Sequence, residues 1–79
     1  MLRMPFIEMT GKTLMQITTG QELTRDDLQA AGVGDESLVR VNPQGDIEVR
    51  KPDGWEIIGG LLGDDFKERV EKATGLDWA

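Results

Sequence analysis

Two turns of the same type divide residues 38–58, and they constrain the fold of this chain more than any other feature. Residues 42–45 carry proline in the second position, where the ring fixes φ at about −65°, and glycine in the fourth, where left-handed backbone is needed. Residues 51–54 repeat this pattern. Each motif is typical of a three-residue hairpin loop in which a type I turn is followed by a glycine bulge.

Counting outward from the two turns gives one register for three antiparallel strands. The charged face of the resulting sheet pairs Arg40 with Glu48 and Arg50 with Glu56, and each such pair contributes about 0.2–1 kcal/mol. Because both turns lead to the same separation of apolar and charged side chains, we predict a three-stranded meander over residues 38–58. The apolar face is expected to carry Val39, Val41, Ile47, Val49, Trp55 and Ile57.

Helix-start patterns lie on both sides of the meander. Thr24 is followed three residues later by Asp27, which predicts a capping box and a short helix over about residues 25–31. Asp65, with a glutamate three residues later, predicts a second helix over about 65–74. A glycine follows each segment and suits a left-handed residue at the helix end.

The N-terminal region fits two structures. Residues 5–10 and 13–18 are rich in β-branched and apolar types, and the Gly-Lys pair between them suits a two-residue turn. We therefore favour an N-terminal β-hairpin that extends the meander. The alternative is a strand followed by a helix that begins after Thr10, with Leu14, Met15 and Ile17 facing inward.

These segments predict one small α+β domain over residues 1–79. Its antiparallel sheet is formed by the meander and the N-terminal hairpin, and two short helices cover the apolar face. The chain has no long linker, internal repeat or low-complexity segment that would separate a second domain.

The composition excludes several classes of chemistry. The chain has no Cys and no His, so thiol and histidine nucleophiles, disulfides and Cys/His zinc sites are absent. A domain of 79 residues also has little room for a concave pocket of about 300 Å³ or more. We expect a non-enzymatic protein without catalytic residues or cofactor.

The charge balance limits the partners. Nine Lys and Arg against 15 Asp and Glu give a net charge of −6, and the basic residues form no run. Binding to nucleic acid or to an anionic membrane surface relies on basic clusters, so neither is expected. No apolar stretch approaches the ~18 residues of a membrane span, and we expect a cytoplasmic protein.

Three glycine motifs suggest phosphate or nucleic-acid binding but lack the required context. Residues 11–13 resemble the end of a phosphate-binding loop, whose first glycine would fall at Phe6. Residues 59–63 follow a strand, but their glycine spacing is not that of a dinucleotide-binding loop. The carboxylates of Asp64 and Asp65 would repel a phosphate here, and they also argue against an RNA-binding Gly-x-x-Gly loop. These segments are interpreted as a turn and a hinge.

A carboxylate group at the start of the last helix leaves a second class of function open. Asp64, Asp65 and Glu68 could gather Mg²⁺ or Ca²⁺, although helix capping explains the same residues and the calcium-loop pattern is absent. We assign no metal ligand and keep binding of a small ligand or a divalent metal as an alternative function.

A second alternative comes from a resemblance. Residues 9–13, Met-Thr-Gly-Lys-Thr, and the order of hairpin, helix and further strands resemble the ubiquitin-like β-grasp family. The resemblance implies a carrier or modifier whose first strand is central in the sheet and parallel to a late strand. The chain departs from that family because Gly59 and Gly60 are internal and are followed by a helix.

The leading hypothesis rests on apolar residues that one small core does not obviously require. Met and Trp are enriched at protein interfaces. We therefore expect a small acidic interaction module that binds a protein partner or itself, as a homodimer. The alternative is that these residues fold over the same core. The candidate surface consists of Met4, Ile58, Leu61, Leu62 and Trp78.

Overall fold

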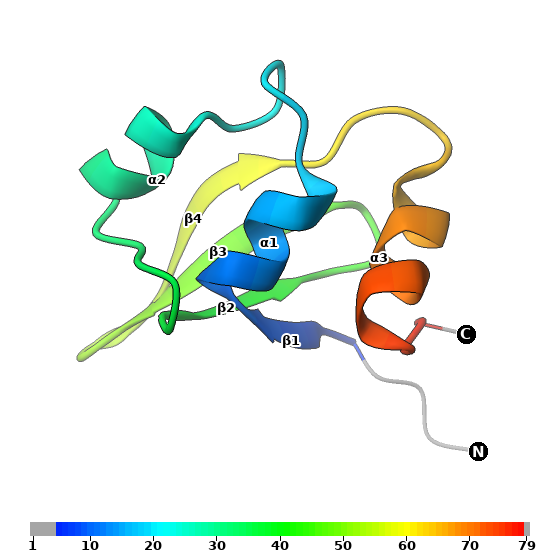
Figure 1. The fold of residues 1–79 in the computed structure, drawn as a ribbon. Coiled ribbons are helices and arrows are strands. Elements are labelled where there is room, and N and C mark those ends of the chain that lie inside the picture. Colours follow the sequence, from blue (N-terminus) through cyan, green and yellow to red (C-terminus); the bar gives the residue numbers. More distant parts are fainter. Residues whose placement is uncertain (1–4, 79) are drawn as a thin grey trace.

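The computed structural model describes residues 5–78 and has α+β architecture, with three helices and four strands within that range (Figure 1). The sheet is antiparallel throughout, and its strands follow the chain order β1-β2-β3-β4. The elements are β1 (Ile7–Thr10), α1 (Gly11–Ile17), α2 (Arg25–Ala30), β2 (Leu38–Val41), β3 (Asp46–Lys51), β4 (Gly54–Gly60) and α3 (Phe66–Thr74).

The helices lie on one side of the sheet, and within residues 5–78 no helix covers the opposite side (Figure 1). Inward-facing strand residues and helix residues form a single apolar cluster between the two layers. Its most deeply buried side chains are Ile7, Leu14, Val39, Val41, Ile47, Val49 and Val70. None of the described residues forms a helix that is long and apolar enough to cross a membrane.

The first hairpin confirms the prediction from the sequence. Val41 lies opposite Ile47 in the β2–β3 pair, and the neighbouring pairs keep the predicted register. Gly45 adopts a φ of 91° and donates its N–H to the carbonyl oxygen of Asn42 at 2.9 Å. The Asn42 side chain also accepts hydrogen bonds from the loop backbone, so the turn is fixed by its own residues.

The second hairpin differs from the prediction by one residue. Gly54 lies opposite Lys51, so the loop has two residues rather than three, and Trp55 faces Arg50. A one-residue shift moves each side chain to the other face of a sheet. Trp55 and Ile57 therefore leave the predicted apolar face, and the predicted pair Arg50–Glu56 does not form.

A β-bulge at Ile58 restores the inward direction farther along β4. The register changes between Ile47, which pairs with Gly59, and Glu48, which pairs with Ile57. Ile58 is the extra residue and packs against the core. A Cβ atom at Gly59 would lie 3.0 Å from the Leu23 side chain, so the glycine lets Leu23 pack closely against β4.

The predicted N-terminal hairpin is wrong in its second half, and the alternative helix is confirmed. Residues 7–10 form β1, which pairs with β2, and the chain then enters α1. Thr10 caps this helix by accepting the N–H of Thr13 at 3.2 Å. Leu14 and Ile17 face the core, so a helix buries apolar residues that the mixed faces of a hairpin would have exposed.

The other helices begin and end close to the predicted residues. Thr24 and Asp27 form the predicted capping box of α2, with bonds of 3.1 and 2.9 Å. Asp65 is the N-cap of α3, but its side chain makes no capping hydrogen bond. Its carboxylate lies 3.7 Å from Nε of Arg69 instead, so the predicted second capping box is absent.

The strand order excludes the β-grasp fold. In that fold the first strand is central and parallel to a late strand. Here β1 is an edge strand and each neighbouring pair is antiparallel. The resemblance of residues 9–13 therefore has no counterpart in the topology, and the helix that begins at Gly11 replaces the expected hairpin.

Candidate functional site

The uncovered side of the sheet, here called the open face, carries an unusual mixture of aromatic, aliphatic and charged side chains. Strand alternation determines which residues lie on this face, because a strand residue whose two neighbours face the core points outward. Ile57 is 65% exposed and Leu38 is 41% exposed on this side. The open face comprises Phe6, Glu8, Thr10, Leu38, Arg40, Glu48, Arg50, Trp55 and Ile57.

Arg40 organises the centre of the open face. Its guanidinium carbon lies 3.7 Å from the centre of the Phe6 ring and 4.1 Å from the centre of the Trp55 ring. Its Nε also contacts Oε1 of Glu48 at 2.5 Å. Cation–π contacts and a carboxylate thus hold one planar group in place. Because these side chains come from β2, β3, β4 and the residue before β1, the arrangement depends on the folded sheet.

The charges of the open face balance one another. Glu8 and Glu48 lie beside Arg40 in one row across the strands, and Arg50 lies opposite Trp55. Asp46, at the end of β3, is held at the hairpin tip by the Asn42 side chain. The central part of the face therefore has as many cations as anions, whereas the chain as a whole has a net charge of −6.

The predicted interaction residues do not form one surface. Leu61 and Trp78 are buried in the core, as in the alternative in which these residues fold over the same core. Trp78 donates its indole N–H to the Val41 carbonyl oxygen at 2.9 Å, so its polar atom is satisfied inside. Ile58 is half-buried and packs on the core. Met4 lies outside the described residues.

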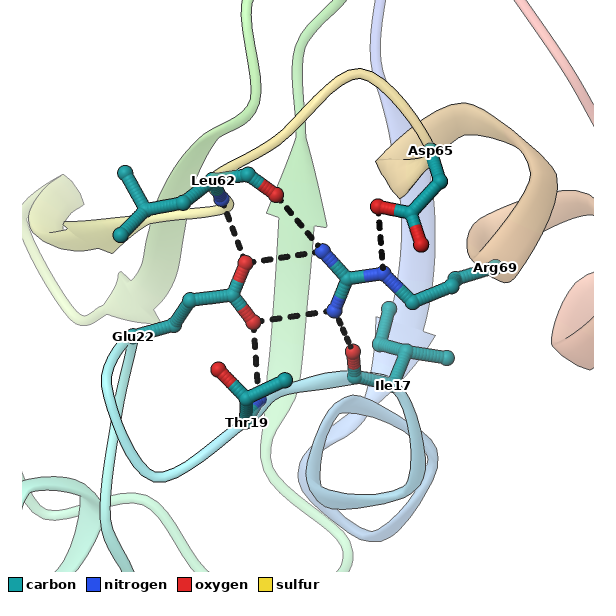
Figure 2. A network of polar contacts seen from close by, with 6 residues as sticks. All are labelled: Ile17, Thr19, Glu22, Leu62, Asp65 and Arg69. Carbon is teal, nitrogen blue, oxygen red and sulfur yellow. Dashed lines mark hydrogen bonds and ion pairs between the residues drawn. The ribbon is translucent and has the colours of Figure 1, made fainter.

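Leu62 is the predicted residue that remains prominently exposed, at 58%. It lies in the link between β4 and α3, away from the strands that form the open face. Its backbone belongs to a polar network instead (Figure 2). Leu62 is therefore almost as exposed as Ile57, but it lies in the link before α3 and not on the open face.

The polar network joins the segment after α1 to the link before α3. Glu22 accepts two hydrogen bonds from the Arg69 guanidinium, at 2.9 and 2.8 Å, and its side chain is only 1% exposed. It also accepts the backbone N–H groups of Thr19, at 2.8 Å, and Leu62 (Figure 2). The Arg69 guanidinium in turn donates to the carbonyl oxygens of Ile17 and Leu62.

The same contacts control the ionisation of the pair. The hydrogen bonds from Arg69 lower the pKa of Glu22 to about 2, and the backbone N–H groups of Leu62 and Thr19 act in the same direction. Glu22 likewise raises the pKa of Arg69. Because the Glu22 carboxylate and the terminal nitrogen atoms of Arg69 are hydrogen-bonded to each other and to the backbone, the network is suited to holding loops together rather than to proton transfer.

A groove of about 660 Å³ lies between α1, α2 and the loop at residues 33–35, so the structure has more concave space than the chain length led us to expect. Its lining includes apolar Met15 and Val33 and charges of both signs, from Lys12 and Asp35. This mixture of apolar and oppositely charged residues does not indicate one class of ligand.

The hypothesised metal site is not formed. Among residues 5–78 no three carboxylates are grouped as metal ligands, so Asp64, Asp65 and Glu68 do not form such a site.

The sequence did not predict the complete cluster around Arg40 or the network of Glu22 and Arg69, and each has an identifiable reason. Arg40 and Glu48 were paired correctly, but Trp55 was assigned to the other face because the second loop was counted as one residue longer. The bond between Glu22 and Arg69 spans 47 positions in the chain, and no local spacing signals such a contact.

Comparisons of this chain with protein-family models, with curated proteins and with solved structures find no match. The functional interpretation therefore depends on the geometry of its own residues.

Proposed function

We propose that the protein is a small non-enzymatic interaction module and that it self-associates through the open face. The observation that carries this proposal is the outward position of Trp55 and Ile57 around Arg40. Tryptophan and arginine are the residue types most enriched among interface hot spots. Ile57 is also an exposed aliphatic side chain, and its removal from water by a partner would favour association.

The charge pattern supports a second copy as partner. Two acidic chains with a net charge of −6 repel one another over long distances, but physiological salt screens charges beyond about 8 Å. At contact distance the balanced charges of the open face matter more. Glu8 and Arg50 of one copy can face opposite charges of the other, because an isologous interface uses one patch twice. A cytoplasmic location stays a prediction from the sequence.

Sedimentation equilibrium from micromolar to millimolar concentration tests the proposal. We expect a reversible monomer–dimer equilibrium for the natural sequence. Ile57→Lys should weaken the dimer at least about tenfold, because burial of one isoleucine contributes about 1.5–3 kcal/mol.

Leu62→Lys is the matched control, since Leu62 is almost as exposed but lies off the open face. This variant should dimerise like the natural sequence. Circular dichroism would confirm that both variants remain folded. A chain that is monomeric at millimolar concentration, or equal weakening by both substitutions, would refute self-association through the open face.

A further inference from the structure

The α2 segment, defined here as residues 24–33, is packed only lightly on the rest of the structure. Every residue of α2 except Leu28 is exposed, and Leu28 is the one buried residue of the whole segment. Figure 1 shows α2 at one end of the helical layer, apart from α3. Few buried apolar side chains are typical of regions that open locally while the remainder of a protein stays folded.

The hydrogen bonds of the α2 segment are almost all internal. Its start is fixed by the capping box described above, and its end by the Val33 N–H, which donates to the Leu28 carbonyl oxygen at 2.8 Å. Within residues 5–78 one hydrogen bond joins the segment to the rest of the chain, from Nζ of Lys51 to the carbonyl oxygen of Ala31 at 2.8 Å. Opening the segment therefore breaks one hydrogen bond and withdraws Leu28, together with the half-buried Val33.

The chain is anchored on both sides of the α2 segment. Before the segment, the Leu23 side chain is buried in the core. After the segment, the carbonyl oxygens of Asp35 and Ser37 accept the N–H groups of the first two residues of α1, at 3.1 and 2.9 Å. Gly32 and Gly34 lie at the exit, where a backbone without a Cβ atom can turn most freely. Opening can therefore be confined to the residues between these anchors.

We infer that the α2 segment is a lid that opens while the sheet, α1 and α3 stay folded, and that the Leu28 side chain holds it closed. Leu28 belongs to the apolar core cluster and also lines the groove between α1 and α2. Withdrawal of this side chain joins the groove to the core, so the open form has a deeper apolar pocket beside Met15. The open face takes no part in this motion, so the lid is independent of the proposed self-association.

Native-state hydrogen exchange, followed by NMR at low protein concentration, tests the lid. The backbone amides of residues 28–33 should exchange through lid opening, and those of β2 and β3 through global unfolding. The lid amides should therefore exchange at least about tenfold faster. Urea below the unfolding transition should accelerate exchange in β2 and β3 steeply but exchange in the lid only slightly, because lid opening exposes little surface.

Ile7→Val separates lid opening from global unfolding. Ile7 is fully buried on β1, which lies well away from α2 (Figure 1). Loss of one buried methylene destabilises the folded chain and should speed exchange in β2 and β3 about two- to tenfold. Because Ile7 stays buried when the lid opens, exchange of the lid amides should not change. Equal acceleration of both groups, or lid amides that exchange as slowly as those of β2 and β3, would overturn the inference.

Leu28→Ala tests which side chain holds the lid closed. It should speed exchange of the lid amides at least about tenfold, because a buried leucine stabilises the closed form but not the open form. Lys51→Met is the second variant, in case Leu28→Ala does not fold. It removes the hydrogen bond to Ala31 but keeps an aliphatic side chain, and it should speed the same amides at least about twofold. Unchanged lid exchange in the folded variants would refute the lid.

Discussion

The replacement of Glu22 by Gln offers the most quantitative test of the structure. The Glu22 carboxylate accepts four hydrogen bonds from Arg69, Thr19 and Leu62. The Gln side chain keeps one oxygen, but its NH₂ group turns a donor toward N–H donors. At least one N–H–oxygen contact is therefore replaced by donor–donor repulsion, while the Arg69 guanidinium loses its charged partner.

The pKa of Glu22 gives the magnitude. A decrease from the ordinary value of 4.5 to about 2 corresponds to about 3 kcal/mol of folding free energy at neutral pH. The side chain is nearly inaccessible, so solvent screening reduces this figure only modestly. We expect E22Q to lower the free energy of unfolding by about 2–4 kcal/mol at pH 7.

The pH dependence has a definite sign. The folded-state pKa of Glu22 lies below the unfolded value, so the stabilisation is fully present above about pH 5 and disappears as the pH falls toward 2. Urea unfolding of both proteins, followed by circular dichroism between pH 2 and 7, should show a large difference at pH 7 that shrinks to a small fraction near pH 2.

Glu71→Gln is the control, because Glu71 lies on an exposed position of α3, the helix that also carries Arg69. This variant should differ from the natural sequence by less than about 0.5 kcal/mol. Equal unfolding midpoints for E22Q and the natural sequence at pH 7 would refute the reasoning. So would a difference that is as large at pH 2 as at pH 7.

Two further substitutions test the packing. Gly11→Ala should destabilise the fold by more than about 3 kcal/mol in urea unfolding, because its Cβ would lie 2.1 Å from the Gly34 carbonyl oxygen. Gly20→Ala, which meets nothing within 4 Å, should be nearly neutral, and equal effects would contradict the close approach. Trp78→Phe should cost about 1–3 kcal/mol, since it leaves the Val41 carbonyl oxygen without its indole partner. Unchanged stability would contradict the buried hydrogen bond and indicate that this indole N–H is bonded to water instead.

The sequence predicted those parts of the fold that neighbouring residues determine. The loop at residues 42–45 is stabilised by hydrogen bonds among its own residues. The capping box of Thr24 and Asp27 likewise involves only four consecutive positions. Both were located correctly. Around Gly11 the local preferences for strand and helix were nearly balanced, and contacts from outside decided the result. The backbone N–H groups of Gly11 and Lys12 donate to carbonyl oxygens in the loop at residues 35–37.

The candidate site could not be predicted, because its position depends on tertiary packing. The Pro-x-Gly pattern at residues 52–54 allows a two-residue or a three-residue loop. Both loop lengths place Gly59 opposite Ile47, where it packs against Leu23, so this distant contact does not distinguish them. The bulge at Ile58 accommodates the difference. A one-residue choice that local sequence leaves open thus decides which side chains reach the open face.

The two tryptophans have different roles in this small chain, one in the core and one on the open face. The sequence predicts Trp55 on the apolar face and leaves Trp78 either in the core or at an interaction surface; in the structure Trp78 is buried and Trp55 lies on the open face. A buried indole needs an acceptor for its N–H, and the Val41 carbonyl oxygen supplies one at the end of β2. Trp78 therefore adds a large side chain to the core, together with an edge-to-face contact to Phe66 at 5.9 Å. Trp55 lies outside this core and stacks on Arg40, so the open face carries an aromatic group.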